Sequence, residues 1–326
     1  MHEWNVCRTG ACLLIWLLTL LSGAVSAQTY PTHPVKLIVP LTAGGPPDRT
    51  ARLLAQRLGE ALKQPVIVEN KTGAGSVLGA DFVVKAAPDG YTLLITNQAS
   101  ISLGPLMRSH TSYDPLKDFA HVAMIGTFPM FFMVRTDHPA RTFQELMTIA
   151  KAKPGSVSYG TSGIGSLGFL IGELLQQNGK VKIVHVAYKG ATPAIADLLG
   201  GHIDATFIAD SSAFEFVRSG KLRMLATTTE KRVPTVPDVP AMDEIVPGVS
   251  GSLWYGVSAP ARTPQAVIDR LQVEILAGIS SAELQTGLTG IGMTPMPLGQ
   301  DQFVVFIQNE MRKWEPIVKA NSIRID

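Results

Sequence analysis

The stretch that decides the fold class is Val35-Lys-Leu-Ile-Val-Pro40-Leu-Thr-Ala-Gly44-Gly45-Pro46-Pro47-Asp48. Its apolar run ends at a proline, which is typical of a buried strand. After the two glycines, apolar residues recur at helical spacing, at Ala51, Leu54, Ala55, Leu58 and Leu62. A strand, a glycine turn and a helix predict the opening of an α/β domain. In such a turn the first N–H groups of the helix face a crevice and attract an anion, although the glycines could also serve only to turn the chain.

Residues 1–27 have the pattern of a secretory signal peptide. Arg8 precedes an apolar run that ends at Leu21, and Val25-Ser-Ala27 predicts cleavage before Gln28. The run is shorter than the roughly 20 residues of a membrane span, so a retained anchor is the less favoured alternative. We expect a soluble protein exported to the periplasm.

Cysteine, histidine and charge exclude several classes of site. Both cysteines, Cys7 and Cys12, lie in the leader, so the mature chain can hold neither a disulfide nor a thiolate metal site. The histidines after His33, at positions 110, 121, 138, 185 and 202, show no metal-ligand spacing. The formal net charge of +2 comes from scattered charges of both signs, which gives no footprint for nucleic acid or an anionic membrane. We expect no metal, no cofactor and no nucleic-acid partner.

The strand-loop-helix pattern occurs in two sets along the mature chain. The first set predicts strands at 37–39, 65–68 and 91–95, and the second predicts strands at 157–159, 183–186 and 203–207. Units of this length predict parallel sheets with right-handed crossovers. Further strands are predicted at 121–125, 130–134, 222–227 and 253–258. A capping box at Ser280-Ser-Ala-Glu283 and a long amphipathic helix at 302–319 predict a tail without a strand.

The second set is embedded between the first set and the tail. This order predicts a discontinuous first domain, residues 28–127 plus 250–326, and an inserted second domain, residues 128–249. The chain would cross between them near 126–131 and again near 249–253. Hinge closure is a known response of such two-domain proteins to a ligand.

Two motifs suggest chemistry and neither is complete. Gly163-Ile-Gly165-Ser-Leu-Gly168 matches the dinucleotide fingerprint GxGxxG, but residues 185–189 lack the acid that would hold the ribose. Gly160-Thr-Ser162-Gly-Ile164 misses the hydrolase pattern GxSxG at its last position. A nicotinamide-dependent oxidoreductase therefore stays an alternative. With no acid pair that suggests a catalytic dyad, we predict a site that binds rather than reacts, with no catalytic residue.

The chain resembles the Bug receptors, the TctC-like periplasmic solute-binding proteins of tripartite tricarboxylate transporters. The resembling segments cover essentially the whole mature chain in order: Tyr30-Pro-x-x-Pro-Val-Lys-Leu-Ile-Val-Pro40, Gly44-Gly45, Val68-Glu-Asn-Lys-x-Gly-Ala-Gly75, Gly79-Ala-Asp81, Lys85-Ala-Ala-Pro-Asp-Gly-Tyr-Thr-Leu93, Tyr113-Asp-Pro-x-Lys-Asp-Phe119, Val186-Ala-Tyr-Lys-Gly190, Asp197-Leu-Leu-Gly-Gly201, Ser219-Gly-Lys-Leu-Arg223 and Trp254-Tyr-Gly-Val-x-Ala-Pro260.

The resemblance implies a type II periplasmic binding fold of the α/β class. Its two lobes would each contain a mostly parallel sheet flanked by helices, would be joined by two crossings, and would close on a small organic carboxylate. A membrane permease would be the partner, with a sensor protein as the alternative, and we expect a monomer. The implied ligand-binding residues are Thr42, Ala43, Gly44, Gly45, Asn97, Ser100, Thr161, Ser162, Gly163, Ile164, Gly165, Phe169, Gly190 and Ala191.

We expect backbone N–H groups rather than a cation to hold the carboxylate. The four candidate loops contain one formal cation, Lys189. The predicted donors are the N–H groups of Gly44, Gly45, Gly163 and Gly165, assisted by the hydroxyls of Thr42, Thr161 and Ser162.

The chain departs from the family pattern at three places. Thr42-Ala43 and Pro46-Pro47 reverse the usual placement of prolines, and proline has no N–H. Phe169 stands where histidine is common, and Ile208 where aspartate is common. If these side chains face the crevice, monocarboxylates with an apolar end should bind better than citrate-like acids. The alternative is that both pack inward and do not affect the ligand.

Overall fold

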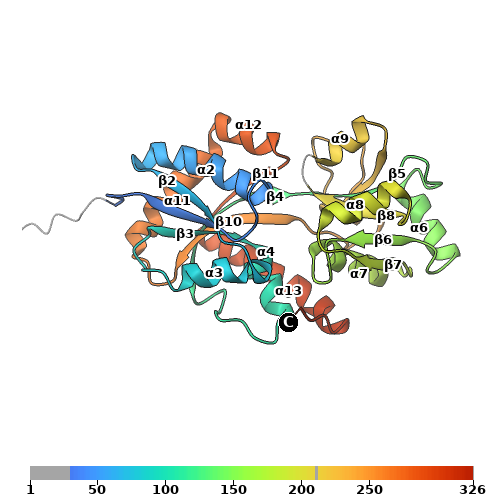
Figure 1. Ribbon diagram of the computed structural model, residues 1–326, viewed down its shortest axis with the longest axis horizontal. Helices are drawn as coiled ribbons and strands as arrows, with labels where there is room; N and C mark the ends of the chain where they lie inside the picture. The colour runs from blue at the N-terminus through green and yellow to red at the C-terminus, as the bar shows by residue number, and fades with distance from the viewer. Residues whose placement is uncertain (1–29, 210–211, 326) are drawn as a thin grey trace, which may run out of the picture. The chain divides into compact units, whose positions relative to one another are not determined.

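The computed structural model describes residues 30–209 and 212–325, so the predicted leader lies outside the described residues. The described residues from Pro34 onward form one compact unit. Two β-sheets organise this unit, and we call the part around each sheet a lobe (Figure 1). The two-lobed α/β class predicted from the sequence is confirmed.

Lobe 1 is built on a six-stranded sheet of order β11-β4-β10-β3-β1-β2. Its strands are β1 (Val35–Val39), β2 (Val66–Asn70), β3 (Thr92–Asn97), β4 (Phe119–Phe128), β10 (Leu253–Pro260) and β11 (Thr294–Gly299). Its helices are α2 (Pro46–Leu62), η1 (Ala74–Ser76), α3 (Val77–Val84), α4 (Gln98–Ile101), α5 (Leu103–Met107), α11 (Gln265–Ser280), α12 (Ala282–Gly290) and α13 (Gln300–Ala320).

Lobe 2 is built on a five-stranded sheet of order β7-β6-β8-β5-β9. Its strands are β5 (Met130–Arg135), β6 (Ser158–Thr161), β7 (Val184–Ala187), β8 (Ala205–Ala209) and β9 (Leu222–Thr227). Its helices are α6 (Phe143–Ala152), α7 (Leu167–Gly179), α8 (Ala191–Gly200), α9 (Ser212–Arg218) and α10 (Met242–Ile245).

Both sheets are mixed around three parallel strands, β2-β1-β3 in lobe 1 and β7-β6-β8 in lobe 2. β1 pairs in parallel with β2 and β3, but β10 runs antiparallel to both β3 and β4. In lobe 2, β6 pairs in parallel with β7 and β8, whereas β5 runs antiparallel to β8 and β9. The physical reason lies in the crossings: β4 leads the chain out of lobe 1 and β10 leads it back, so the two adjacent strands run in opposite directions.

Two further details of the tail differ from expectation. Strand β11 lies in the tail that was predicted to have none, and it pairs antiparallel with the edge of β4. Its two apolar positions, Met296 and Leu298, alternate with prolines, a pattern too weak to indicate a strand by itself. The predicted capping box is also shifted by one residue, because Ser281 rather than Ser280 caps α12 by accepting the N–H of Leu284.

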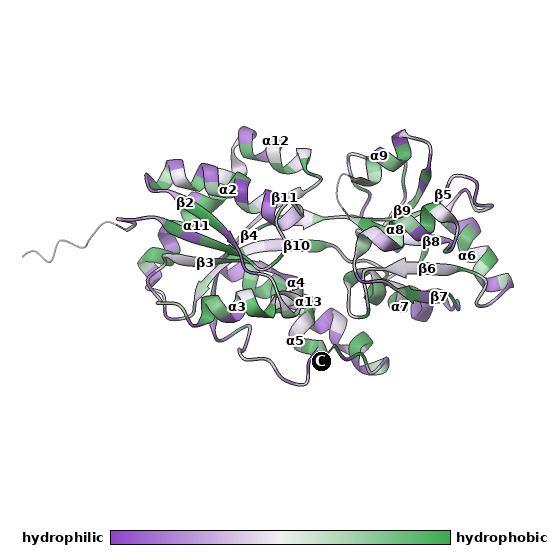
Figure 2. Ribbon diagram, viewed as in Figure 1, coloured by the Kyte–Doolittle hydropathy of each residue, from purple (hydrophilic) through white to green (hydrophobic). Residues whose placement is uncertain are grey.

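The predicted amphipathic pattern of α2 is present in the structure. All five predicted apolar positions, from Ala51 to Leu62, are buried. Figure 2 shows hydrophilic and hydrophobic residues alternating along this helix. The helix thereby covers its sheet with one face and holds its first turn at the carboxyl end of β1.

One apolar cluster includes residues from both lobes. Leu103 and Met107 of α5 and Trp314 of α13 pack with Leu167 and Ile171 of α7. The predicted domain boundaries, 28–127 plus 250–326 and 128–249, stay a prediction. With these boundaries, the cluster would contain residues of both domains. Within residues 30–209 and 212–325, we find no helix whose length and apolar content would suit a membrane span.

Candidate functional site

A cavity of about 490 Å³ lies between the two lobes. Lobe 1 contributes the residues after β1, the start of α2 and the beginning of β10, and lobe 2 contributes the ends of β6 and β8 and the starts of α7 and α8. The lining residues are Leu41, Thr42, Gly45, Pro46, Pro47, Met130, Thr161, Ser162, Ser166, Leu167, Gly168, Ala191, Thr192, Ala194, Ile195, Thr206, Phe207, Ile208, Ala209, Leu253 and Tyr255. Among these described lining residues none is Asp, Glu, Lys, Arg or His.

The start of α7 offers two backbone donors to this cavity. Ser166 caps the helix, and its hydroxyl oxygen accepts the N–H of Phe169 at 3.3 Å. The first intrahelical bond is donated by Leu170 to the Ser166 carbonyl. The N–H groups of Leu167 and Gly168 precede it and have no partner within the helix. Both residues line the cavity, so their N–H groups can bind an anion there.

Gly168 allows this helix start to approach β8 closely. A β-carbon at this position would lie 3.2–3.3 Å from the ring and Cβ of Phe207. Close helix–strand packing is the role of the third glycine in GxGxxG. The fingerprint in the sequence therefore indicates a tightly packed helix start, whatever anion it serves.

The start of α8 offers two more donors. Gly190 caps the helix with φ of 118°, and Ala191 and Thr192 form its first two positions. Pro193 follows and has no N–H, so the orphan donors of this turn are those of Ala191 and Thr192. Both residues are exposed and line the cavity.

The start of α2 is different because prolines occupy its first two positions. Gly45 is the N-cap, and Pro46 and Pro47 follow it. Of the first three helical residues, only Asp48 retains an N–H. The third helix start at this cavity therefore offers little to an anion.

The carboxylate of Asp48 lies at this same helix start. Its Oδ2 accepts the N–H of Gly44 at 2.9 Å and Nε of Arg52 at 2.9 Å, and Oδ1 accepts Nη2 of Arg52 at 3.1 Å. Burial raises the pKa of this carboxyl, but the bonds from Arg52 and Gly44 outweigh it and hold the pKa below its usual value. Asp48 is thus an anion supplied by the chain itself.

Thr161 is held by contacts within lobe 2. Its Oγ1 lies 2.7 Å from Nε2 of His185 and 3.2 Å from the carbonyl oxygen of Gly163. Burial lowers the pKa of His185, which favours the neutral imidazole. The Thr161 hydroxyl, at the edge of the cavity, therefore already has hydrogen-bond partners within lobe 2.

Comparison with known proteins identifies the family. The family model described as the tripartite tricarboxylate transporter family receptor matches residues 50–323. Protein BugT of Bordetella pertussis is 34% identical over 324 residues, which cover 98% of this chain and 99% of BugT. The chain belongs to the tripartite tricarboxylate transporter receptor family.

Solved structures of similar proteins agree with this membership. Rpa4515 of R. palustris, solved with adipate, is 32% identical with a TM-score of 0.80, covering 90% of this chain and 99% of that chain. MatC of Rhodopseudomonas palustris, solved with bound malate, is 29% identical with a TM-score of 0.73, covering 89% of this chain and 100% of that chain. The comparisons support the solute-receptor prediction and give no support to the oxidoreductase alternative.

Five of the residues predicted for this receptor line the cavity: Thr42, Gly45, Thr161, Ser162 and Ala191. The other nine lie outside the lining: Ala43, Gly44, Asn97, Ser100, Gly163, Ile164, Gly165, Phe169 and Gly190. The residues of lobe 2 that line the cavity therefore include the first turns of α7 and α8, and they do not include Gly163 and Gly165.

Gly44 and Gly165 have structural roles of their own in this conformation. The N–H of Gly44 donates to Asp48, and its predicted role as a ligand donor stays a prediction. Gly165 has φ of 81°, and a β-carbon there would lie 2.7 Å from Cγ2 of Ile325. It serves a tight turn against the end of the chain.

Asn97 and Ser100 bind each other. The side-chain oxygen of Asn97 accepts the N–H of Ser100 at 3.0 Å, and the Ser100 hydroxyl oxygen accepts the N–H of Asn97 at 3.3 Å. Both side chains are buried. This reciprocal cap of α4 uses the polar groups that were expected to face the ligand.

Phe169 and Ile208 lie in different surroundings, and one of the two lines the cavity. Ile208 lines the cavity at the end of β8. Phe169 packs against the lobe 2 core, with its ring centroid 4.7 Å from that of His185. The apolar wall predicted for the ligand's far end therefore includes Ile208 but not Phe169.

Several lining residues were missed by the sequence analysis. Ser166, Gly168 and Thr192 were recognisable as a helix cap, the last fingerprint glycine and a first-turn residue. Pro46 and Pro47 were noted only as lost donors. Met130, Thr206, Leu253 and Tyr255 lie on strands that meet only in the folded chain, and no local signal marks them.

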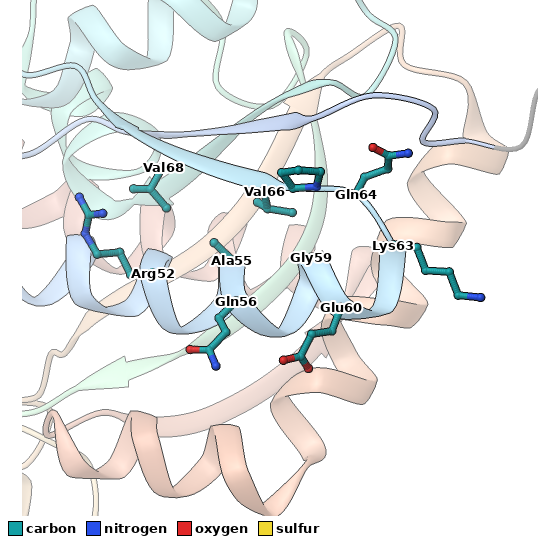
Figure 3. A pocket seen from close by; sticks show the side chains of 10 residues that line it. Arg52, Ala55, Gln56, Gly59, Glu60, Lys63, Gln64, Val66 and Val68 are labelled. Carbon is teal, nitrogen blue, oxygen red and sulfur yellow. The ribbon is translucent and has the colours of Figure 1, made fainter.

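Cavity size alone does not select this site. A larger cavity, about 650 Å³, lies on α2 and the edge strand β2, with Arg52, Gln56, Glu60 and Lys63 along its rim (Figure 3). It has charged residues of both signs and belongs to lobe 1 alone. The interlobe cavity is the candidate because helix starts from both lobes meet there. Among the described residues, no group of three His, Cys, Asp or Glu side chains could hold a metal ion.

Proposed function

We propose that this receptor acts in the periplasm, where it captures a small organic carboxylate in its interlobe cavity. It then delivers the carboxylate to a membrane permease of the tripartite tricarboxylate type. The observation that carries the proposal is the pair of helix starts, α7 and α8, whose first-turn residues line one cavity with no charged residue among its described lining residues. The N–H groups left unpaired in these two first turns, together with two positive dipole ends, suit one carboxylate. The adipate and malate in the two similar structures support this ligand class.

The proposal includes binding without turnover by a monomer. The two lobes would be residues 28–127 plus 250–326 and residues 128–249, and they would close on the ligand after cleavage of the 1–27 leader. A sensor protein remains the second candidate partner, because the cavity is compatible with either. Crosslinking the ligand-loaded receptor in native membranes, followed by identification of the partner, distinguishes a permease from a sensor.

A thermal-shift screen of the mature protein against small organic acids tests the ligand class. A ligand at 100 times its dissociation constant should stabilise the protein by about 2.7 kcal/mol. Nicotinamide cofactors serve as the comparison, and they should give no shift. Stabilisation by a nicotinamide cofactor with no response to any acid would contradict the proposal. Small-angle scattering should show a more compact particle with a saturating acid.

A further inference from the structure

The two walls of the interlobe cavity differ in their ability to hold an anion. We propose that the ligand is a monocarboxylate whose carboxylate lies against the starts of α7 and α8, and whose apolar end lies against the start of α2. The inference rests on the proposed function and adds the ligand's class and orientation.

The start of α2 lacks the N–H donors that a second carboxylate would need. Pro46 and Pro47 occupy the first two positions of α2 and line the cavity without an N–H. The N–H of Gly44 is already donated to Asp48. The hydroxyl of Thr42 is a donor that this wall retains, but a carboxylate placed here would lose more hydration than so few protein donors can replace.

Charge at this wall also opposes a second carboxylate. The Asp48 side chain is 3% exposed and ionised, and it is bound to Gly44 and Arg52 behind the prolines. It occupies the positive end of the helix dipole that an incoming anion would use. Arg52 is not among the lining residues and its Nε and Nη2 are bound to the same carboxylate.

The apolar lining of the lobe 1 wall suits an apolar group. Leu41, Pro46, Pro47 and Leu253 supply carbon surface, and Ile208 and Ile195 continue it across lobe 2. A cavity with apolar walls and polar groups at one end fixes a ligand's orientation. The four donors of α7 and α8 define the polar end.

Hexanoate and adipate test the inference, because they have the same chain length and differ in one terminal carboxylate. Titration calorimetry on the mature protein should show hexanoate binding at least about tenfold more tightly than adipate. Benzoate should also bind more tightly than citrate. Tighter binding of adipate or citrate would overturn the inference and leave the proposed function intact. If no mono-, di- or tricarboxylate binds, the proposed function fails and the inference with it.

Restoring the missing donors provides the second measurement. Pro46→Ala combined with Pro47→Ala returns two N–H groups to the first turn of α2, so the hexanoate-to-adipate affinity ratio should fall by about tenfold. Pro264→Ala, at the cap of α11, is the control and should leave the ratio unchanged. The single variant Pro46→Ala serves if the double variant fails to fold, since Pro47 is buried. An unchanged ratio in a folded Pro46→Ala protein would overturn the role assigned to the prolines.

Discussion

The starts of α2 and α8 both follow a glycine turn, both carry proline, and both line the same cavity. In α2 the prolines hold the first and second helical positions, whereas in α8 the single Pro193 holds the third. This difference removes the donors of α2 and leaves two in α8. In addition, α2 has the Asp48 carboxylate at its own positive end, and α8 has no acidic residue in its first turn.

The comparison shows that a glycine turn before a helix does not by itself make an anion site. What matters is which N–H groups remain after proline positions and internal acceptors are counted. By that count lobe 2 retains more of the first-turn N–H groups, which is the basis for the proposed placement of the carboxylate. The predictions below alter one side of the comparison at a time.

Ala191→Pro should have the largest effect, because it gives α8 the first-position proline of α2. Proline is well accepted at this position, and the ψ of 172° at Gly190 before it lies outside the α region that a following proline disfavours. Loss of one N–H bond to a charged ligand costs about 1.5–3 kcal/mol, which is about 10- to 150-fold in affinity. Calorimetry with hexanoate measures this loss of affinity, and Ala191→Ser is the matched control. Equal affinity in the proline and serine variants would show that this N–H does not bind the ligand.

Asp48→Asn tests whether the internal anion of α2 is ionised. Because the folded-state pKa of Asp48 lies below the unfolded value, its contribution to stability is present above the unfolded pKa and is lost as pH falls through the folded pKa. Thermal midpoints of the wild type should therefore fall more steeply than those of the variant below about pH 4. Parallel pH curves would contradict the ion-paired assignment.

Removal of a hydroxyl should weaken ligand binding more on the lobe 2 wall than on the lobe 1 wall. Ser162 on lobe 2 and Thr42 on lobe 1 are both exposed and both line the cavity. Ser162→Ala should weaken hexanoate binding by about fivefold, the value of one hydrogen bond of about 1 kcal/mol. Thr42→Ala should weaken it by less than about twofold, since the apolar end lies there. A larger loss in the Thr42 variant would reverse the proposed orientation.

Lys189→Ala should have the smallest effect. Lys189 is exposed and lies outside the cavity lining, so solvent and salt screen its charge. Affinity for hexanoate at physiological salt should change by less than about twofold. A loss above tenfold would mean that a point charge, not the helix starts, holds the carboxylate.

Much of the fold could be predicted from local patterns. The apolar spacing of Ala51 to Leu62 predicted α2, and the branched run before Pro40 predicted β1. These patterns are local because a strand or a helix buries one face at a fixed period. The bond between Gly44 and Asp48 spans four residues and was also within reach of the sequence. Apolar spacing predicts the helix but does not indicate what the carboxylate of Asp48 binds.

The lining of the site depended on contacts between distant residues. Thr161 is held by His185, and the N–H of Trp254 at the second crossing donates to Gln98, which lies 156 residues earlier. Strand β11 forms because it pairs with the edge of β4, and its own sequence does not indicate a strand. The sequence alone predicted most of the strands and helices and the family resemblance. The tertiary structure decided which donors stay available, because a hydrogen-bond donor can bind a ligand only if no partner from elsewhere in the chain has already taken it.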